Sequence, residues 1–107
     1  LSFYDEYTYE EYQIQLANRS SPQYRWKMEC KGDGKVKTRQ DKVYDEDVGY
    51  WGVYKLTADK PGNLTVTMMY SNGEETMYTV TFDLTVNEDG TIRENSRDGD
   101  IDEAMTS

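Results

Sequence analysis

Residues 78–86 decide the fold class, because they read Tyr-Thr-Val-Thr-Phe-Asp-Leu-Thr-Val with a large apolar side chain at every second position. A period of two is typical of a β-strand that buries one face, and the β-branched residues favour the same structure. The alternation recurs in residues 14–16, 24–30, 54–58 and 64–70, with a weaker pair expected at Val36 and Val43 or Tyr44.

Turn sequences separate these runs. Asn72-Gly73 is the strongest short hairpin signal, and residues 87–90 carry a second turn that ends in glycine. Two glycines lie in residues 31–35, and Lys60-Pro61-Gly62-Asn63 fits a tight turn in which proline fixes one φ and glycine accepts a positive one. Short strands broken in this way predict an all-β protein, an antiparallel sandwich or barrel.

The two ends of the chain differ from its middle. Residues 1–11 are dense in Tyr, Asp and Glu, and we expect an acidic arm or a first strand there. Residues 12–93 are expected to form one domain that ends in a short strand at 91–93. Residues 94–107 are expected to be an acidic, solvated tail.

Composition excludes several classes of function. The chain of 107 residues has 12 Lys and Arg against 21 Asp and Glu, a net charge of −9, which opposes binding to nucleic acid. No apolar run is long enough for a membrane-spanning helix. The chain has no histidine, so it lacks the commonest general base and zinc ligand, and we expect neither an enzyme nor a cofactor.

The cysteine and the clustered acidic residues are the candidates for chemistry. Cys30, the one cysteine, has no histidine to activate it and lies in an alternating run, so we expect a buried, inert thiol. Trp26 lies in the same run and is expected in the core. The acidic residues at 45–47 and 98–102 lack the spacing of a calcium loop, which favours a solvated surface over a metal site or a glycosidase pair.

Three segments between the predicted strands follow a recognisable order. Leu16 leads through a small polar stretch to Tyr24-Arg25-Trp26, and Gly49-Tyr50-Trp51-Gly52 precedes the next strand. The Thr-rich run 64–70 ends in tyrosine and is followed by Ser71-Asn72-Gly73-Glu74. This order resembles the chagasin-like inhibitors of papain-type cysteine proteases, although Trp51 stands where the family has glycine and 71–74 replaces the family's Arg-Pro-Trp.

The resemblance spans residues 12–86 and implies an immunoglobulin-like antiparallel β-sandwich of about seven strands. It also implies an exported, extracellular or cell-surface protein whose loops enter the cleft of a papain-like protease without offering a scissile bond. The residues expected to bind the partner are Ser20, Ser21, Pro22, Gln23, Gly49, Tyr50, Trp51, Gly52, Ser71, Asn72 and Gly73.

Two questions stay open at this point. Tyr50 and Trp51 are either an exposed aromatic anchor for a partner or a cover folded back over the end of the sandwich. The whole domain is either such an inhibitor or a structural or adhesive immunoglobulin-like domain of a cell-surface protein. The ten tyrosines fit both a binding surface and the edge of a thin core.

Overall fold

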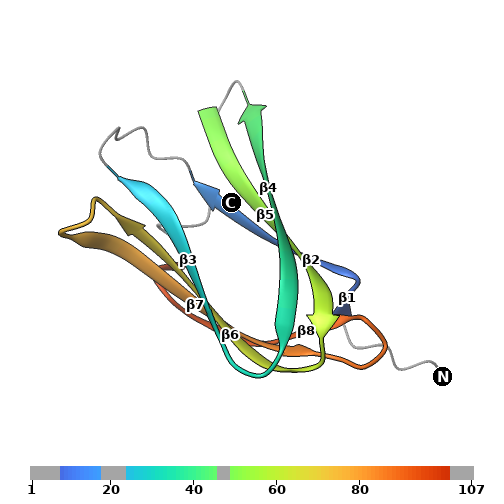
Figure 1. Cartoon of the computed structure of the whole chain (residues 1–107). Helices are drawn as coiled ribbons and strands as arrows, with labels where there is room; N and C mark the ends of the chain where they lie inside the picture. The colour runs from blue at the N-terminus through green and yellow to red at the C-terminus, as the bar shows by residue number, and fades with distance from the viewer. Residues whose placement is uncertain (1–7, 18–23, 46–48, 102–107) are drawn as a thin grey trace.

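The computed structural model describes residues 8–17, 24–45 and 49–101 and arranges them as two antiparallel β-sheets packed face to face (Figure 1). The larger sheet has the strand order β1-β8-β7-β6-β3, and the smaller has the order β2-β5-β4. The strands are β1 (Thr8–Tyr9), β2 (Glu11–Ala17), β3 (Arg25–Lys31), β4 (Lys35–Asp45), β5 (Gly49–Lys60), β6 (Gly62–Ser71), β7 (Thr76–Val86) and β8 (Ile92–Gly99). The predicted all-β antiparallel sandwich is confirmed.

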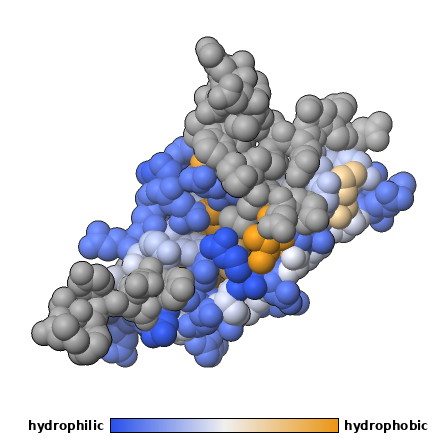
Figure 2. All heavy atoms as spheres, turned by 180° about the vertical axis from the view of Figure 1, so that it is seen from behind, coloured by the Kyte–Doolittle hydropathy of each residue, from blue (hydrophilic) through white to orange (hydrophobic). Residues whose placement is uncertain are grey.

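The core lies between the sheets and consists of the apolar positions of the alternating runs. On β7, Val80 and Phe82 are fully buried, and the register places them opposite Met68 and Val66 of β6. The smaller sheet contributes fully buried aliphatic side chains, among them Ile14, Leu16 and Leu56. Seen from behind, the surface is mainly hydrophilic, and hydrophobic residues show in a restricted area (Figure 2).

Two strands are longer than their apolar residues predict. β4 is one continuous strand of 11 residues rather than a weak pair of short segments, because it is paired with β5 along its whole length. β8 continues to Gly99 instead of ending at residue 93. A register shift between Asp83 and Leu84 lets this polar segment stay paired with β7. Residues 94–99 therefore belong to the sheet and not to a solvated tail.

The edge position of β3 corrects one expectation and modifies another. Cys30 is exposed, so the predicted burial of its thiol is wrong. The reason is that β3 is the outer strand of its sheet and Cys30 lies near the end of that strand. Partial burial still raises the pKa of this thiol, against a smaller opposing effect of Lys35. Trp26 is half-buried and packs against the core rather than lying wholly within it.

Two connections between the sheets pack backbone against backbone at one end of the sandwich. The amide of Gly34, between β3 and β4, donates a hydrogen bond to the carbonyl of Asn63, 2.9 Å away. A Cβ at Gly34 would lie 2.5 Å from the carbonyl oxygen of Gly62, and a Cβ at Gly62 would lie 2.6 Å from the amide nitrogen of Gly34. Gly62 also has a φ of +143°, which only glycine adopts readily. The two connections can approach this closely only because both residues are glycine. We call this end of the sandwich the crossover end.

A polar cluster joins the two sheets in the same half of the molecule. The Tyr12 hydroxyl on β2 donates to the Glu94 carboxylate on β8, which also accepts from Arg97 at 2.5 Å. Arg97 lies over the ring of Phe82, 5.4 Å from its centroid. Because the irregularity in β8 falls between them, Glu94 and Arg97 are opposite Leu84 and Phe82, two residues of β7 whose side chains face the core.

Candidate protein-binding end of the sandwich

The strand ends that flank the three predicted loops lie at the end opposite the crossovers, where the two sheets spread apart (Figure 1). In the larger sheet, Arg25 at the start of β3 pairs with Ser71 at the end of β6. In the smaller sheet, Ala17 at the end of β2 pairs with Trp51 near the start of β5. The connections 18–23, 46–48 and 72–75 therefore leave the same end of the sandwich, hereafter the open end.

The second of these connections is shorter than the glycine motif predicted. Residues 49–52 are the first four residues of β5 and not a loop, so this expectation is wrong. The register pairs Tyr50 with Tyr44 and Trp51 with Val43, and such aromatic and β-branched pairs favour extension of a hairpin. Gly52 lies within the strand, where a Cβ would contact only the Tyr54 ring, at 3.9 Å.

The third connection is the predicted Asn-Gly turn between β6 and β7. The Asn72 side-chain oxygen accepts hydrogen bonds from the amides of Glu74 and Glu75, at 2.9 and 2.7 Å. Gly73 has a φ of +98°, and its amide donates to the Ser71 hydroxyl. A Cβ at Gly73 would meet nothing within 4 Å, so the tip of this turn faces open space.

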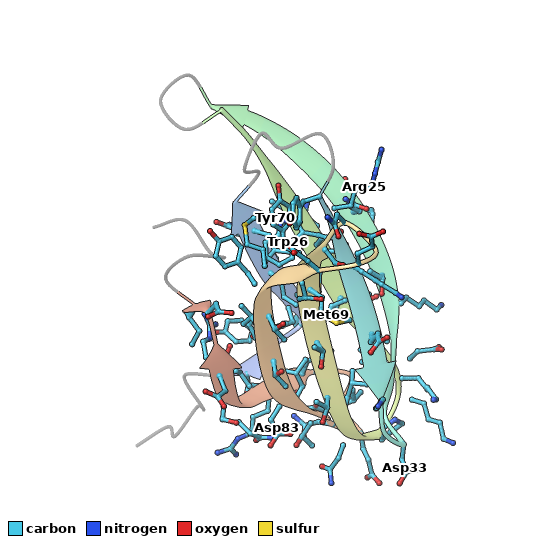
Figure 3. The ribbon with its side chains drawn as sticks, turned by 90° about the vertical axis from the view of Figure 1, so that its left-hand side faces the viewer. Arg25, Trp26, Asp33, Met69, Tyr70 and Asp83 are labelled. Atoms are coloured by element: carbon cyan, nitrogen blue, oxygen red, sulfur yellow. The ribbon has the colours of Figure 1, made fainter. Side chains whose placement is uncertain are left out.

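Aromatic side chains support the open end from within the larger sheet. Tyr70 is almost fully buried and has stacked contacts with Tyr24 and Tyr78, with centroids 5.4 and 6.0 Å apart. Trp26 is tilted against Tyr70 at 5.0 Å, and the two lie side by side in Figure 3. The Tyr24 hydroxyl donates to Glu75, which ties the start of β3 to the β6–β7 turn. These contacts fix the start of β3 relative to the β6–β7 turn.

A groove of about 450 Å³ lies on the outer face of the larger sheet beside the β6–β7 turn. Arg25 and Met69 are labelled in Figure 3, which views this face. The groove combines two cations, one carboxylate, an apolar side chain and a turn backbone, a mixture suited to a polypeptide ligand. Its lining residues are Arg25, Lys27, Glu29, Met69, Ser71, Asn72, Gly73 and Thr76.

The predicted binding residues are thus divided. Ser71, Asn72 and Gly73 lie at the open end and line the groove. Gly49, Tyr50, Trp51 and Gly52 lie at the same end but on a strand; the side chains of Tyr50 and Trp51 are not among those described, so the choice between anchor and cover stays a prediction. Ser20, Ser21, Pro22 and Gln23 lie outside the described residues.

Within residues 8–17, 24–45 and 49–101, no three His, Cys, Asp or Glu side chains lie together as metal ligands. No helix in that part of the chain is both long and apolar enough to cross a bilayer. The sequence does not predict the Tyr12–Glu94–Arg97 cluster, because Tyr12 and Glu94 are 82 residues apart and the irregular pairing of β8 is needed to bring Glu94 and Arg97 together.

Hydrogen bonds and burial shift the pKa values of that cluster. Burial, followed by the hydrogen bond and charge of Glu94, raises the pKa of Tyr12. For Glu94, burial is the largest single effect and acts upwards, but the hydrogen bonds from Arg97 and Tyr12 and the charge of Arg97 together hold its pKa below the ordinary value. The Glu94 carboxylate is therefore a structural anion rather than a proton donor near neutral pH.

In comparisons with known proteins, the chain matches no family model, no curated protein and no solved structure.

Proposed function

We propose that the chain is an exported protein-binding domain, a chagasin-like inhibitor of papain-type cysteine proteases. One observation carries the proposal. The strand ends that flank the segments 18–23, 46–48 and 72–75 lie at the same end of the sandwich, although these segments are far apart in the sequence. An inhibitor that fills a cleft with several loops needs those loops at one end of its scaffold.

The strand order supports an immunoglobulin-like assignment. In immunoglobulin sandwiches the strands B, E and D are neighbours in one sheet, and C, F and G in the other. If β2 is taken as strand B and the strands are lettered in chain order, the smaller sheet reads B-E-D. The strands β3, β6 and β7 then read C-F-G. β8 and β1 extend the second sheet beyond strand G.

The mechanism proposed is steric. The open end would occupy the substrate cleft of the protease and present no extended scissile segment to its nucleophile. Gly73 exposes backbone at the tip of a turn, and Gly52 is a strand residue without a side chain. Both permit the close approach of a partner's main chain. The aromatic contacts of Tyr70 would reduce the entropy lost on binding, because they order the turn beforehand.

A titration of papain tests this function directly. Papain activity is measured against increasing concentrations of the intact protein with a small fluorogenic substrate. We expect activity to be lost at micromolar protein or below. Full activity at that concentration would overturn the proposal and favour a structural or adhesive domain.

A matched pair of aromatic variants tests the surface that binds. Trp51→Ala removes an aromatic side chain from the open end, and we expect the complex to dissociate faster, by roughly tenfold or more if Trp51 is an anchor. Tyr9→Ala is the control, because Tyr9 is a partly exposed aromatic residue paired with Ile92 at the crossover end. Equal dissociation rates for Trp51→Ala and the unmodified protein would remove Trp51 from the contact.

A further inference from the structure

The edge strand β3 leaves part of the sandwich interior uncovered. β3 pairs with β6 on one side only, and among the described residues its other side has no neighbouring strand. Trp26 and Met28 point toward the core but are only half-buried, and Cys30 on the same face is exposed. Backbone groups along the free side of an edge strand are available to pair with another chain.

Charge is unevenly distributed around this edge. Residues 25–41, which span β3 and most of β4, hold six Lys or Arg and three Asp or Glu, a net charge of +3. The rest of the chain therefore carries a net charge of −12, which together with this +3 gives the total of −9. Arg25, Lys27 and Lys31 share the face of β3 away from the core with one acidic residue, Glu29. None of the three cations forms an ion pair within 4 Å in the described part of the chain. Arg39 of β4, by contrast, pairs with Glu11 and Asp41.

We propose that β3 binds an extended acidic segment of a partner protein by strand addition. Main-chain hydrogen bonds would extend the larger sheet by one strand beyond β3. Side chains at alternate positions of the added strand would be acidic, and would lie beside Arg25, Lys27 and Lys31. The positions between them would be apolar, and would cover Trp26 and Met28. The edge thus selects a peptide in which acidic and apolar residues alternate.

A second copy of the same edge fits less well. Antiparallel pairing of two β3 strands about Met28 would place Arg25 opposite Lys31, a repulsive pair, and Lys27 opposite Glu29, an attractive pair, so the charges of two copies gain little on balance. Cations on an edge strand are also a known defence against self-association. An acidic strand, by contrast, is attracted by all three cations and repelled only at Glu29, so the charge of this edge favours an acidic partner over a second copy.

The test uses a blocked peptide of alternating Glu and Val with the 7-residue length of β3 and the full chain. Binding is followed by fluorescence anisotropy of a labelled peptide. Lys27→Glu should weaken binding by about fivefold, because it replaces an attraction by a repulsion. Arg93→Glu is the control with the same change of charge, since Arg93 is an exposed residue of β8, three strands away from β3 in the larger sheet, and it should change binding by less than about twofold.

Cys30 provides an independent readout of where the peptide lies. It is the one cysteine of the chain, it is exposed, and it lies on the face of β3 that the added strand would cover. The bound peptide should slow alkylation of this thiol by about tenfold when nearly all sites are filled. A peptide that binds and leaves the alkylation rate unchanged would place the ligand elsewhere and overturn the proposal.

Two further peptides separate strand addition from simple charge attraction. A Lys/Val peptide of the same length should not bind, and equal binding of it would overturn the role of the cations. A Glu/Val peptide with a central proline keeps most of the charge but cannot complete the backbone pairing, so it should bind several-fold more weakly. If it bound as tightly as the unbroken peptide, the surface would be a polyanion site and not a strand acceptor.

Discussion

The two ends of this sandwich use glycine for opposite purposes. At the crossover end, a Cβ on Gly34 or on Gly62 would collide with backbone atoms of the other glycine, because the two connections between the sheets pack tightly against each other. At the open end, the positions of a Cβ on Gly52 and Gly73 meet ordinary contacts or none. Glycine at the first end is required by the fold, whereas at the second end there is space for a Cβ. Stability and binding should therefore respond separately to substitutions at the two ends.

The largest expected effect is at the crossover end. Gly62→Ala adds a Cβ 2.6 Å from the Gly34 amide nitrogen and strains a residue with a φ of +143°. Overpacking and backbone strain together should lower the free energy of unfolding by about 3 kcal/mol. Urea denaturation followed by tryptophan fluorescence measures this as a lower midpoint at unchanged slope.

Gly73→Ala is the matched substitution at the open end. Gly73 also has a positive φ, +98°, but a Cβ there would meet nothing within 4 Å. The cost should be that of the strained conformation alone, about 1 kcal/mol. Equal losses for the two variants would contradict the distinction between the ends, because they would show that crowding at Gly62 contributes nothing.

A smaller effect is expected at the Tyr12–Glu94–Arg97 cluster, which reinforces the half of the molecule near the crossover end. The pKa of Glu94 is held below its ordinary value of about 4.3 in the folded protein. A lowered carboxyl pKa contributes stability above the unfolded-state pKa, and that contribution is lost as the pH falls through the folded-state pKa. Glu94→Gln should therefore cost about 1–2 kcal/mol at pH 7 and progressively less below about pH 4.

Thermal unfolding of the unmodified protein and of the Glu94→Gln variant between pH 7 and pH 3 measures the difference in their stability. Asp41 and Asp89 also have lowered pKa values, the first mainly through its hydrogen bond from Lys55 and the second through Thr91, and their contribution is the same in both proteins. The difference between the curves therefore isolates Glu94. A constant difference across the pH range would mean that the ionised form of Glu94 has no special role.

Some strands of the sandwich can be predicted from the sequence, and others cannot. The strands β6 and β7 were predictable, because every second residue is large and apolar and an Asn-Gly turn lies between them. β4 and the second half of β8 were not, since their side chains are polar and they are held by pairing with β5 and β7. A strand with one buried face shows an alternation of apolar and polar residues in its sequence. A polar edge strand that is held by main-chain pairing shows almost no such alternation.

The same reasoning explains the errors at the candidate site. The glycine motif at residues 49–52 predicts a loop by composition, but Tyr50 and Trp51 have strand-forming partners in Tyr44 and Val43 that only the register reveals. The burial of Cys30 was predicted from alternation alone. Alternation identifies the face of a strand, but it does not show whether the strand is central or at the edge of its sheet.

The smallest effect on stability, and the most informative for binding, is expected from Gly52→Ala. A Cβ at this position would contact only the Tyr54 ring at 3.9 Å, so the free energy of unfolding should stay the same or rise by up to about 0.5–1 kcal/mol, as alanine is less costly than glycine within a strand. If the open end inhibits papain through close main-chain contact, the added methyl group should weaken inhibition by roughly tenfold.

Gly90→Ala is the control for this last prediction. Gly90 lies in the β7–β8 turn near the crossover end, with a φ of +88° and open space around it. Its substitution should cost about 1 kcal/mol in stability and leave inhibition unchanged. The two variants should therefore have opposite effects. Gly90→Ala should lower stability and leave inhibition unchanged, whereas Gly52→Ala should weaken inhibition without lowering stability. Inhibition equally strong in both variants would show that Gly52 does not approach the protease, and a marked loss of stability in Gly52→Ala would show that this glycine, too, serves the fold.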